Sequence, residues 1–122
     1  MCLHLFKKRN AFEKNAKKYV KEKFYFLTSA GYKYKYYFLN GEEEHTFCND
    51  KISIQIYYVT STFAFDISVY DSKFPYSKGK NIKEIIQVSE EKLKLFSPIE
   101  TVDYYSELIK QNLDKIEKSM NQ

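Results

Sequence analysis

The 122-residue chain has no tryptophan, only three glycines and two prolines, and only two cysteines and two histidines. So little glycine and proline excludes collagen-like and low-complexity chains. No uninterrupted apolar run reaches the roughly 18 residues that a membrane span requires. Cys2 and Cys48 are too few for a disulfide framework, and the apolar start of the chain precedes Lys7-Lys8-Arg9, the reverse order of a secretory signal. We therefore expect a cytoplasmic protein with reduced thiols.

The residues that are present predict one folded domain spanning residues 1–122. Apolar residues make up 43% and charged residues 30% of the chain, close to the globular average. Lysine outnumbers arginine 19 to one, and tyrosine and phenylalanine supply 22 residues, a bias that AT-rich codons also produce. Residues 1–35 hold ten basic and two acidic side chains, whereas residues 36–72 hold one lysine and six acids. Such an asymmetry creates a dipolar surface that steers partners.

The apolar spacing predicts a helix followed by a meander of four strands. Over about residues 9–30 apolar side chains recur three or four positions apart, and Gly31 follows where a left-handed C-cap residue is expected. From Tyr32 the period changes to two, which is typical of a half-buried strand. Asn40-Gly41 predicts a two-residue hairpin turn. Further strands are expected at about residues 43–48, Ile52–Tyr57 and Phe63–Tyr70.

Two capping boxes predict helices after the meander. Asn81 is followed by Glu84, and Ser97-Pro98 by Glu100, so we expect helices over about residues 82–95 and 98–119. The order α-β-β-β-β-α-α predicts an α+β fold, a four-stranded antiparallel meander with one face covered by the three helices. The side chains expected to face these helices are Ile52, Ile54, Ile56, Phe63, Phe65 and Ile67.

The sequence offers few groups for catalysis. His45 and Cys48 lie close together, but positions 45 and 48 of a strand point to opposite faces, so the pair could meet only at a bulge. We interpret His45 as an exposed hairpin residue and Cys48 as a buried one. A metal site built from Cys2, His4, His45 and Cys48 lacks the paired spacing of structural zinc sites. Glycine-rich phosphate loops and HExxH motifs are absent, so we expect no enzyme activity, no metal and no cofactor.

The alternation of tyrosine and lysine over residues 32–36 argues against nucleic acid as a partner. On a strand the three rings share one face and the two lysines the other, so bases could not stack on the rings while those lysines held the backbone. A module that binds nucleic acid or a small apolar ligand is nevertheless the alternative function, because the aromatic density and the basic N-terminal quarter favour it.

Several segments resemble a known group of proteins. The segments are Phe24-Tyr-Phe-Leu-Thr-Ser-Ala-Gly-Tyr-Lys33, Tyr36-Tyr-Phe, Asn49-Asp-Lys-Ile-Ser-Ile-Gln-Ile-Tyr57 and Phe63-Ala-Phe-Asp-Ile-Ser-Val69. Over about residues 12–70 this pattern resembles small uncharacterised bacterial α+β proteins, some of which are immunity proteins of polymorphic toxin systems. The resemblance implies a cognate toxin as partner and no catalytic residues.

The uncovered face of the predicted sheet is the expected binding surface, since it combines tyrosines with hydrogen-bonding groups. Asp66 on this face is either a charge that keeps the sheet soluble or a binding contact, and Glu42–Glu44 form either a solvated tip or an acidic patch. We expect a non-catalytic domain that binds a protein and no membrane. As an immunity protein it would occlude a toxin's active site, its acids mimicking phosphates if the toxin is a nuclease. The expected partner-binding residues are Tyr37, Gln55, Tyr57, Asp66, Tyr70, Glu42, Glu43 and Glu44.

Overall fold

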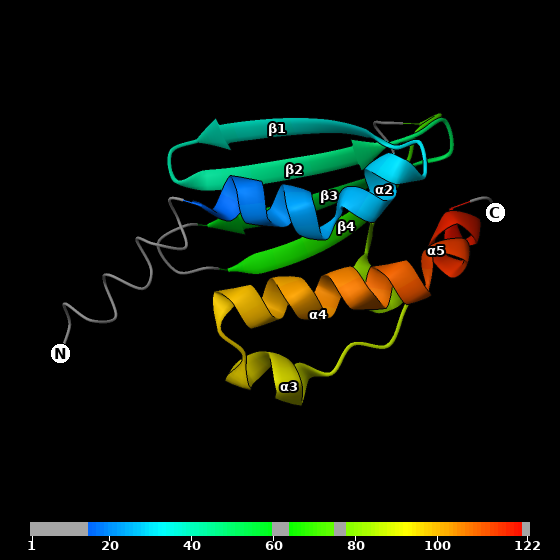
Figure 1. Cartoon of the computed structure of the whole chain (residues 1–122). Coiled ribbons are helices and arrows are strands. Elements are labelled where there is room, and N and C mark those ends of the chain that lie inside the picture. Colours follow the sequence, from blue (N-terminus) through cyan, green and yellow to red (C-terminus); the bar gives the residue numbers. More distant parts are fainter. Residues whose placement is uncertain (1–14, 60–63, 75–77, 121–122) are drawn as a thin grey trace, which may run out of the picture.

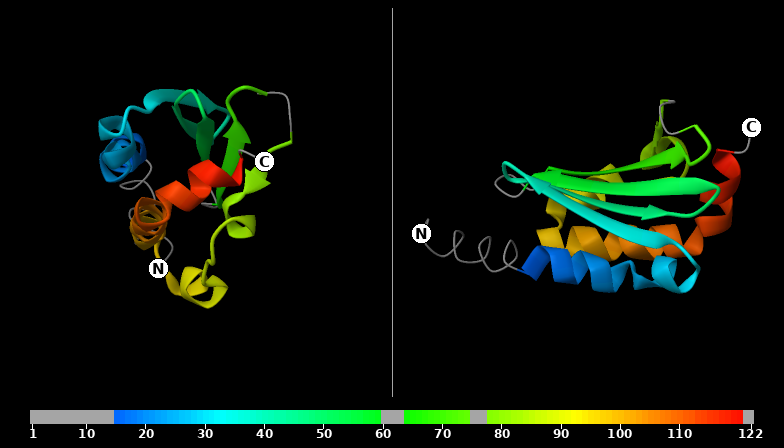
Figure 2. Two further views of the ribbon diagram at one scale, coloured as in Figure 1. Left: turned by 90° about the vertical axis from the view of Figure 1, so that its right-hand side faces the viewer. Right: turned by 90° about the horizontal axis from the view of Figure 1, so that it is seen from above.

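The computed structural model of the protein describes residues 15–59, 64–74 and 78–120. It has the expected α+β fold, with an antiparallel sheet in the order β1-β2-β3-β4-β5 and helices packed on one face (Figures 1 and 2). The strands are β1 (Lys33–Leu39), β2 (Glu42–Cys48), β3 (Ile52–Val59), β4 (Phe65–Asp71) and β5 (Lys80–Asn81). The sheet therefore has five strands rather than four, because the two residues of β5 pair with Ser68 and Val69.

The described residues also form six helical segments. The N-terminal helix, residues 15–23, is followed by α2 (Tyr25–Ser29), the 3-10 turn η1 (Ile82–Glu84), α3 (Glu90–Leu95), α4 (Pro98–Gln111) and α5 (Leu113–Ser119). The predicted helix over residues 9–30 is thus divided at Phe24, and its residues 9–14 lie outside the described part. Gly31 has the expected left-handed φ of 97° after the C-cap.

The predicted β1–β2 hairpin is confirmed. Asn40 and Gly41 both have positive φ, 51° and 79°, as the two central residues of a type I′ turn require. Asparagine and glycine tolerate this conformation at little cost, so the turn fixes which residues of β1 and β2 lie opposite each other. Leu39 pairs with Glu42 beside the turn, and Lys33 pairs with Cys48 at the other end.

The prediction of one helix over residues 82–95 is wrong, and the helix predicted over 98–119 has the observed ends but is interrupted at Asn112. Asn81 does form a capping box with Glu84, but only η1 follows it. The Ser89 hydroxyl accepts from Lys92 N, and this second N-cap begins α3 separately. At Asn112 the side-chain amide donates to Leu108 O at 2.8 Å, and this competition with backbone hydrogen bonding accompanies the break between α4 and α5.

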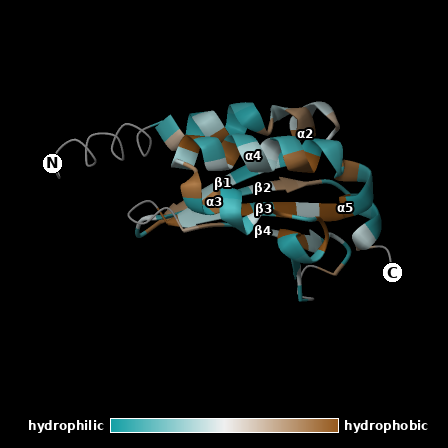
Figure 3. Cartoon of the chain, turned by 90° about the horizontal axis from the view of Figure 1, so that it is seen from below, coloured by the Kyte–Doolittle hydropathy of each residue, from teal (hydrophilic) through white to brown (hydrophobic). Residues whose placement is uncertain are grey.

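One face of the sheet and the inner sides of the helices form the core. The predicted isoleucines of β3 and β4 are buried there and Phe65 packs against them, as expected, while Phe63 lies outside the described residues. The N-terminal helix and α4 run side by side beneath the sheet (Figure 1), and their outer sides are largely hydrophilic (Figure 3). Asp103 of α4 joins the two helices, since its Oδ1 accepts from Tyr19 OH at 2.5 Å and lies 3.2 Å from Lys23 Nζ.

The N-cap of α4 gives a stability prediction. The Ser97 hydroxyl accepts from Glu100 N at 3.2 Å, and Glu100 Oε1 accepts from Ser97 N at 3.0 Å. We expect Ser97→Ala to lower the free energy of unfolding by about 1 kcal/mol in urea titrations, because the Glu100 backbone N–H loses its side-chain acceptor. Ser29→Ala, at an exposed serine that ends α2, is the matched control and should change it by less than about 0.5 kcal/mol. Equal effects of the two changes would contradict the role of the cap.

Candidate functional site

None of the described helices lies on the second face of the sheet (Figure 2). Side chains on this open face are half-buried or exposed along all four long strands. The structure thus leaves a continuous four-stranded surface available for contact.

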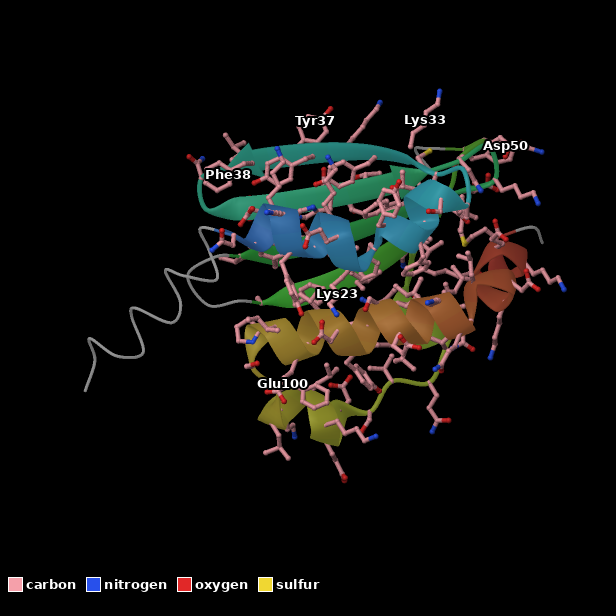
Figure 4. The ribbon with its side chains drawn as sticks, in the orientation of Figure 1. Lys23, Lys33, Tyr37, Phe38, Asp50 and Glu100 are labelled. Carbon is pink, nitrogen blue, oxygen red and sulfur yellow. The ribbon has the colours of Figure 1, made fainter. Side chains whose placement is uncertain are left out.

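Six residues form what we call the acidic-aromatic band of the open face. The strand register places Tyr37, Glu44, Tyr57 and Asp66 in one row across four adjacent strands, with Glu42 and Gln55 beside it. Tyr37 is 62% exposed and projects away from the helices (Figure 4). Asp66 shares this face with Gln55 and Tyr57, as the sequence predicts. Two tyrosines and three carboxylates therefore lie together on the half of the face that adjoins the β1–β2 turn.

Hydrogen bonds order the side chains of the band. Tyr57 OH donates to Glu42 Oε1 at 2.5 Å, and Gln55 Nε2 donates to Glu44 Oε1. The hydrogen bond to Glu42 raises the pKa of Tyr57, so this hydroxyl stays protonated at neutral pH. Asp66 Oδ1 accepts from Asn81 Nδ2 at 2.6 Å. Groups held in this way lose less conformational freedom when a partner binds.

Two of the predicted partner-binding residues lie apart from the band. Tyr70 is on the open face but at its opposite end, opposite Ser53, and its ring packs on Gly79, where a Cβ would come within 2.5 Å of Tyr70 Cε1. Glu43 is only 3% exposed and lies on the covered face of the sheet. The expectation that Glu43 joins its two neighbours in a surface patch is therefore wrong, because adjacent residues of a strand point to opposite faces.

Glu43 belongs instead to a buried polar network between the sheet and the N-terminal helix. Tyr36 OH donates to Glu43 Oε1 at 2.6 Å, and Tyr58 also hydrogen-bonds to Glu43. His45, fully buried, lies 2.8 Å through Nδ1 from Tyr34 OH and 3.1 Å through Nε2 from Tyr58 OH. The interpretation of His45 as an exposed hairpin residue is therefore wrong.

The number of protons decides the direction of these hydrogen bonds. Tyr58 has one hydroxyl proton, which it donates to the Glu43 carboxylate, so it accepts from His45 Nε2–H. His45 Nδ1 then accepts from Tyr34 OH. Burial, with a smaller contribution from Lys17, lowers the pKa of His45 to about 4, so the ring is neutral at physiological pH. Burial is also the main cause that raises the pKa of Tyr34, to about 12. Among the described residues no buried side-chain N or O atom lacks a partner.

The remaining candidate catalytic and metal-ligating residues are His45, Cys48, Cys2 and His4. His45 and Cys48 point to opposite faces, as expected, and Cys48 is half-buried on the open face rather than buried in the core. Its Sγ lies 3.4 Å from Ser72 Oγ. Cys2 and His4 lie outside the described residues, within which no three metal-ligating side chains cluster.

No family model, no curated protein and no solved structure matches the chain. Within the described residues, no helix is long and apolar enough to cross a membrane.

The sequence interpretation missed the buried polar network, although a signal for it exists. Every second residue of β2 is buried, namely Glu43, His45 and Phe47. Because side chains of a strand alternate between its two faces, Glu43 and His45 lie on the same face as Phe47. Tyr34 and Tyr36 lie opposite Phe47 and His45 across the hairpin that Asn40-Gly41 predicts. Only the register brings the phenol groups to the imidazole and the carboxylate.

Proposed function

We propose that this chain is a non-catalytic protein-binding domain that uses the acidic-aromatic band to cover a basic surface of its partner. The observation that carries the proposal is the row of Tyr37, Glu44, Tyr57 and Asp66 across four strands of an uncovered sheet. Tyrosines contribute large, rigid contact areas, and carboxylates around them select a partner of opposite charge.

The helix side of the molecule suits this role less well. The helices have lysines and glutamates on their outer sides, and such strongly hydrated groups are depleted in the cores of protein interfaces. The band, by contrast, places aromatic rings and carboxylates within one continuous surface. This contrast supports the open face as the contact surface.

In the specific form of the proposal, the partner is a toxin and the chain is its immunity protein. The ordered carboxylates of Glu42, Glu44 and Asp66 would occupy the positions of phosphates in a basic active site, and the domain would inhibit by occlusion. Carboxylates in these positions would fit the active site of a nuclease or of another enzyme that acts on a polyanion. The resemblance found in the sequence supports the same role.

Co-expression with the products of the neighbouring genes tests this function. We expect one neighbouring product to be toxic when expressed alone, to be neutralised by this chain, and to elute with it from a size-exclusion column. A triple variant, Glu42→Gln, Glu44→Gln and Asp66→Asn, should lose neutralisation while keeping cooperative unfolding, since these side chains are exposed or half-buried. If no neighbouring product is toxic and bound, the immunity role is wrong.

A further inference from the structure

A second surface of the molecule, which shares only Tyr37 with the acidic-aromatic band, lies at the outer edge of β1. β1 is the first strand of the sheet, and no described segment pairs with its other side. Leu39 and Glu42 flank a two-residue turn and so form a hydrogen-bonded pair, and such pairs alternate with non-bonded ones along an antiparallel ladder. The backbone N–H and C=O groups of Tyr34, Tyr36 and Phe38 therefore point away from β2, where another strand could bind them.

Lysines surround the first half of this edge on both faces of the sheet. Lys33 and Lys35 lie on the open face, where both are exposed. On the covered face Lys17 Nζ lies 4.4 Å from the ring centre of Tyr36, and Lys21 Nζ lies 5.3 Å from that of Tyr34. Two lysines thus lie beside the tyrosine rings on the covered face, and two lie on the open face of the same half of β1.

The second half of the edge is apolar. Tyr37, Phe38 and Leu39 are 62%, 59% and 68% exposed, three consecutive large side chains at the end of an edge strand. Figure 4 shows Lys33 and Phe38 toward opposite ends of β1. Exposed edges of this kind are usually covered or blocked in folded proteins, and uncovered ones bind added strands.

We propose that the outer edge of β1 binds an extended peptide segment whose acidic half lies beside the lysines and whose apolar half lies beside Tyr37, Phe38 and Leu39. Side chains of an added strand alternate between the two faces of the sheet. Because lysines lie on both faces, every position of the acidic half meets an ammonium group, so consecutive acidic residues fit. The peptide backbone pairs with Tyr34, Tyr36 and Phe38.

Other occupants fit this edge less well. Antiparallel pairing with β1 of a second copy over the whole edge would set the lysine half of each chain beside the apolar half of the other, and it would supply no acidic group to the lysines. A nucleic acid could bind the ammonium groups but has no backbone pattern that matches the N–H and C=O groups of a strand edge. An acidic peptide satisfies both features.

The test uses two labelled synthetic peptides, because an added strand can run in either direction. One carries about four glutamates followed by about three apolar residues, and the other has the reverse order. By fluorescence anisotropy at low salt we expect at least one to bind, and its lysine-for-glutamate analogue not to. The variant Lys33→Glu, Lys35→Glu should bind about tenfold more weakly or worse. The matched control Lys92→Glu, Lys94→Glu, at exposed lysines of α3 with the same change in net charge, should lose much less.

N-methylated peptides test the backbone pairing without changing the protein. Alternate amides of a strand point to opposite edges, so methylating one alternate set should abolish binding and methylating the other should not. Equal binding of the two N-methylated peptides overturns the proposal. So does an equal loss of peptide affinity in the Lys33→Glu, Lys35→Glu variant and in the Lys92→Glu, Lys94→Glu control. The proposal is also wrong if the protein alone forms a dimer that the variant Lys33→Glu, Lys35→Glu dissociates. It is wrong as well if the protein binds an oligothymidine of the same length more tightly than the acidic peptide.

This inference and the proposed function can fail separately. The peptide does not contact Tyr57 or Asp66, so the variant Tyr57→Ala, Asp66→Ala should bind it with unchanged affinity. Loss of peptide binding in that variant would contradict the location at the β1 edge, whatever the outcome with a toxin.

Discussion

Acidification from about pH 7 to about pH 4 is expected to remove about 3 kcal/mol of the free energy of unfolding through His45 alone. Burial lowers the pKa of this histidine from 6.5 to about 4 in the folded protein. Between these values the unfolded chain binds a proton that the folded chain does not, so stability falls as the pH falls through this window. Above this pH window His45 is neutral in both the folded and the unfolded state, so it does not change the free energy of unfolding with pH.

The hydrogen bonds of His45 explain why the folded protein disfavours the proton. His45 Nδ1 accepts from Tyr34 OH, and Nε2 donates to Tyr58 OH. A proton added to Nδ1 would create a buried cation that Lys17 repels, and Nδ1 could no longer accept from Tyr34 OH. A buried charge of this kind is costly unless it is paired.

Urea titrations at a series of pH values measure this effect. The control is His45→Gln, which keeps one donor and one acceptor but does not titrate. We expect the wild-type chain to lose about 3 kcal/mol more than the variant between about pH 7 and pH 4. Parallel pH profiles of the two proteins would mean that His45 does not titrate with a lowered pKa. Acid-sensitive carboxylates elsewhere cancel in this comparison, because both proteins contain them.

The second large effect is expected for the double variant Tyr57→Ala, Asp66→Ala. It should weaken a partner bound at the acidic-aromatic band by about 2 kcal/mol or more, the lower limit for interface hot spots and equivalent to about thirtyfold in Kd. Tyr57 contributes ring area at the centre of the band, and Asp66 contributes a charge on the neighbouring strand. Titration calorimetry with the product of the neighbouring gene measures it.

Two further variants separate binding from folding. Asp66→Asn keeps an acceptor for Asn81 Nδ2 and removes only the charge, so it isolates the electrostatic part of the loss. Tyr25→Ala, Asp114→Ala removes the same residue types at exposed positions on α2 and α5 and should not affect binding. Loss of cooperative unfolding in the variant Tyr57→Ala, Asp66→Ala would mean that these two residues stabilise the core. Unchanged affinity would place the binding surface elsewhere.

Local patterns predict the fold where a single short-range interaction decides the structure. Asn40-Gly41 tolerates the two positive φ angles of its turn, and the capping box at Ser97 begins α4. The alternation in Ile52–Tyr57 predicts which face of β3 is buried. It also places Gln55 and Tyr57 on the open face. For such features the physical cause lies within a few residues of the chain.

Prediction fails where distant residues compete or combine. The capping box at Asn81 begins only a 3-10 turn, since Ser89 starts a separate helix and Ile82, Ile85 and Ile86 are buried in the core. Glu43 belongs to an acidic run at a turn, a pattern that indicates solvent, yet the β1–β2 and β2–β3 pairings bring Tyr36 and Tyr58 to its carboxylate. A buried charge depends on partners that lie far away in the sequence.

The sequence by itself determined the α+β class, the hairpin turn, the apolar face of the meander and the place of the open face, because periodicity and turn geometry are local properties of the chain. Only the tertiary structure decided that His45 and Glu43 are buried, that Tyr57 and Asp66 lie side by side, and that lysines of the N-terminal helix lie over tyrosine rings of β1. Those outcomes depend on strand register and on the packing of the N-terminal helix, which place residues from separate segments within a few ångströms of each other.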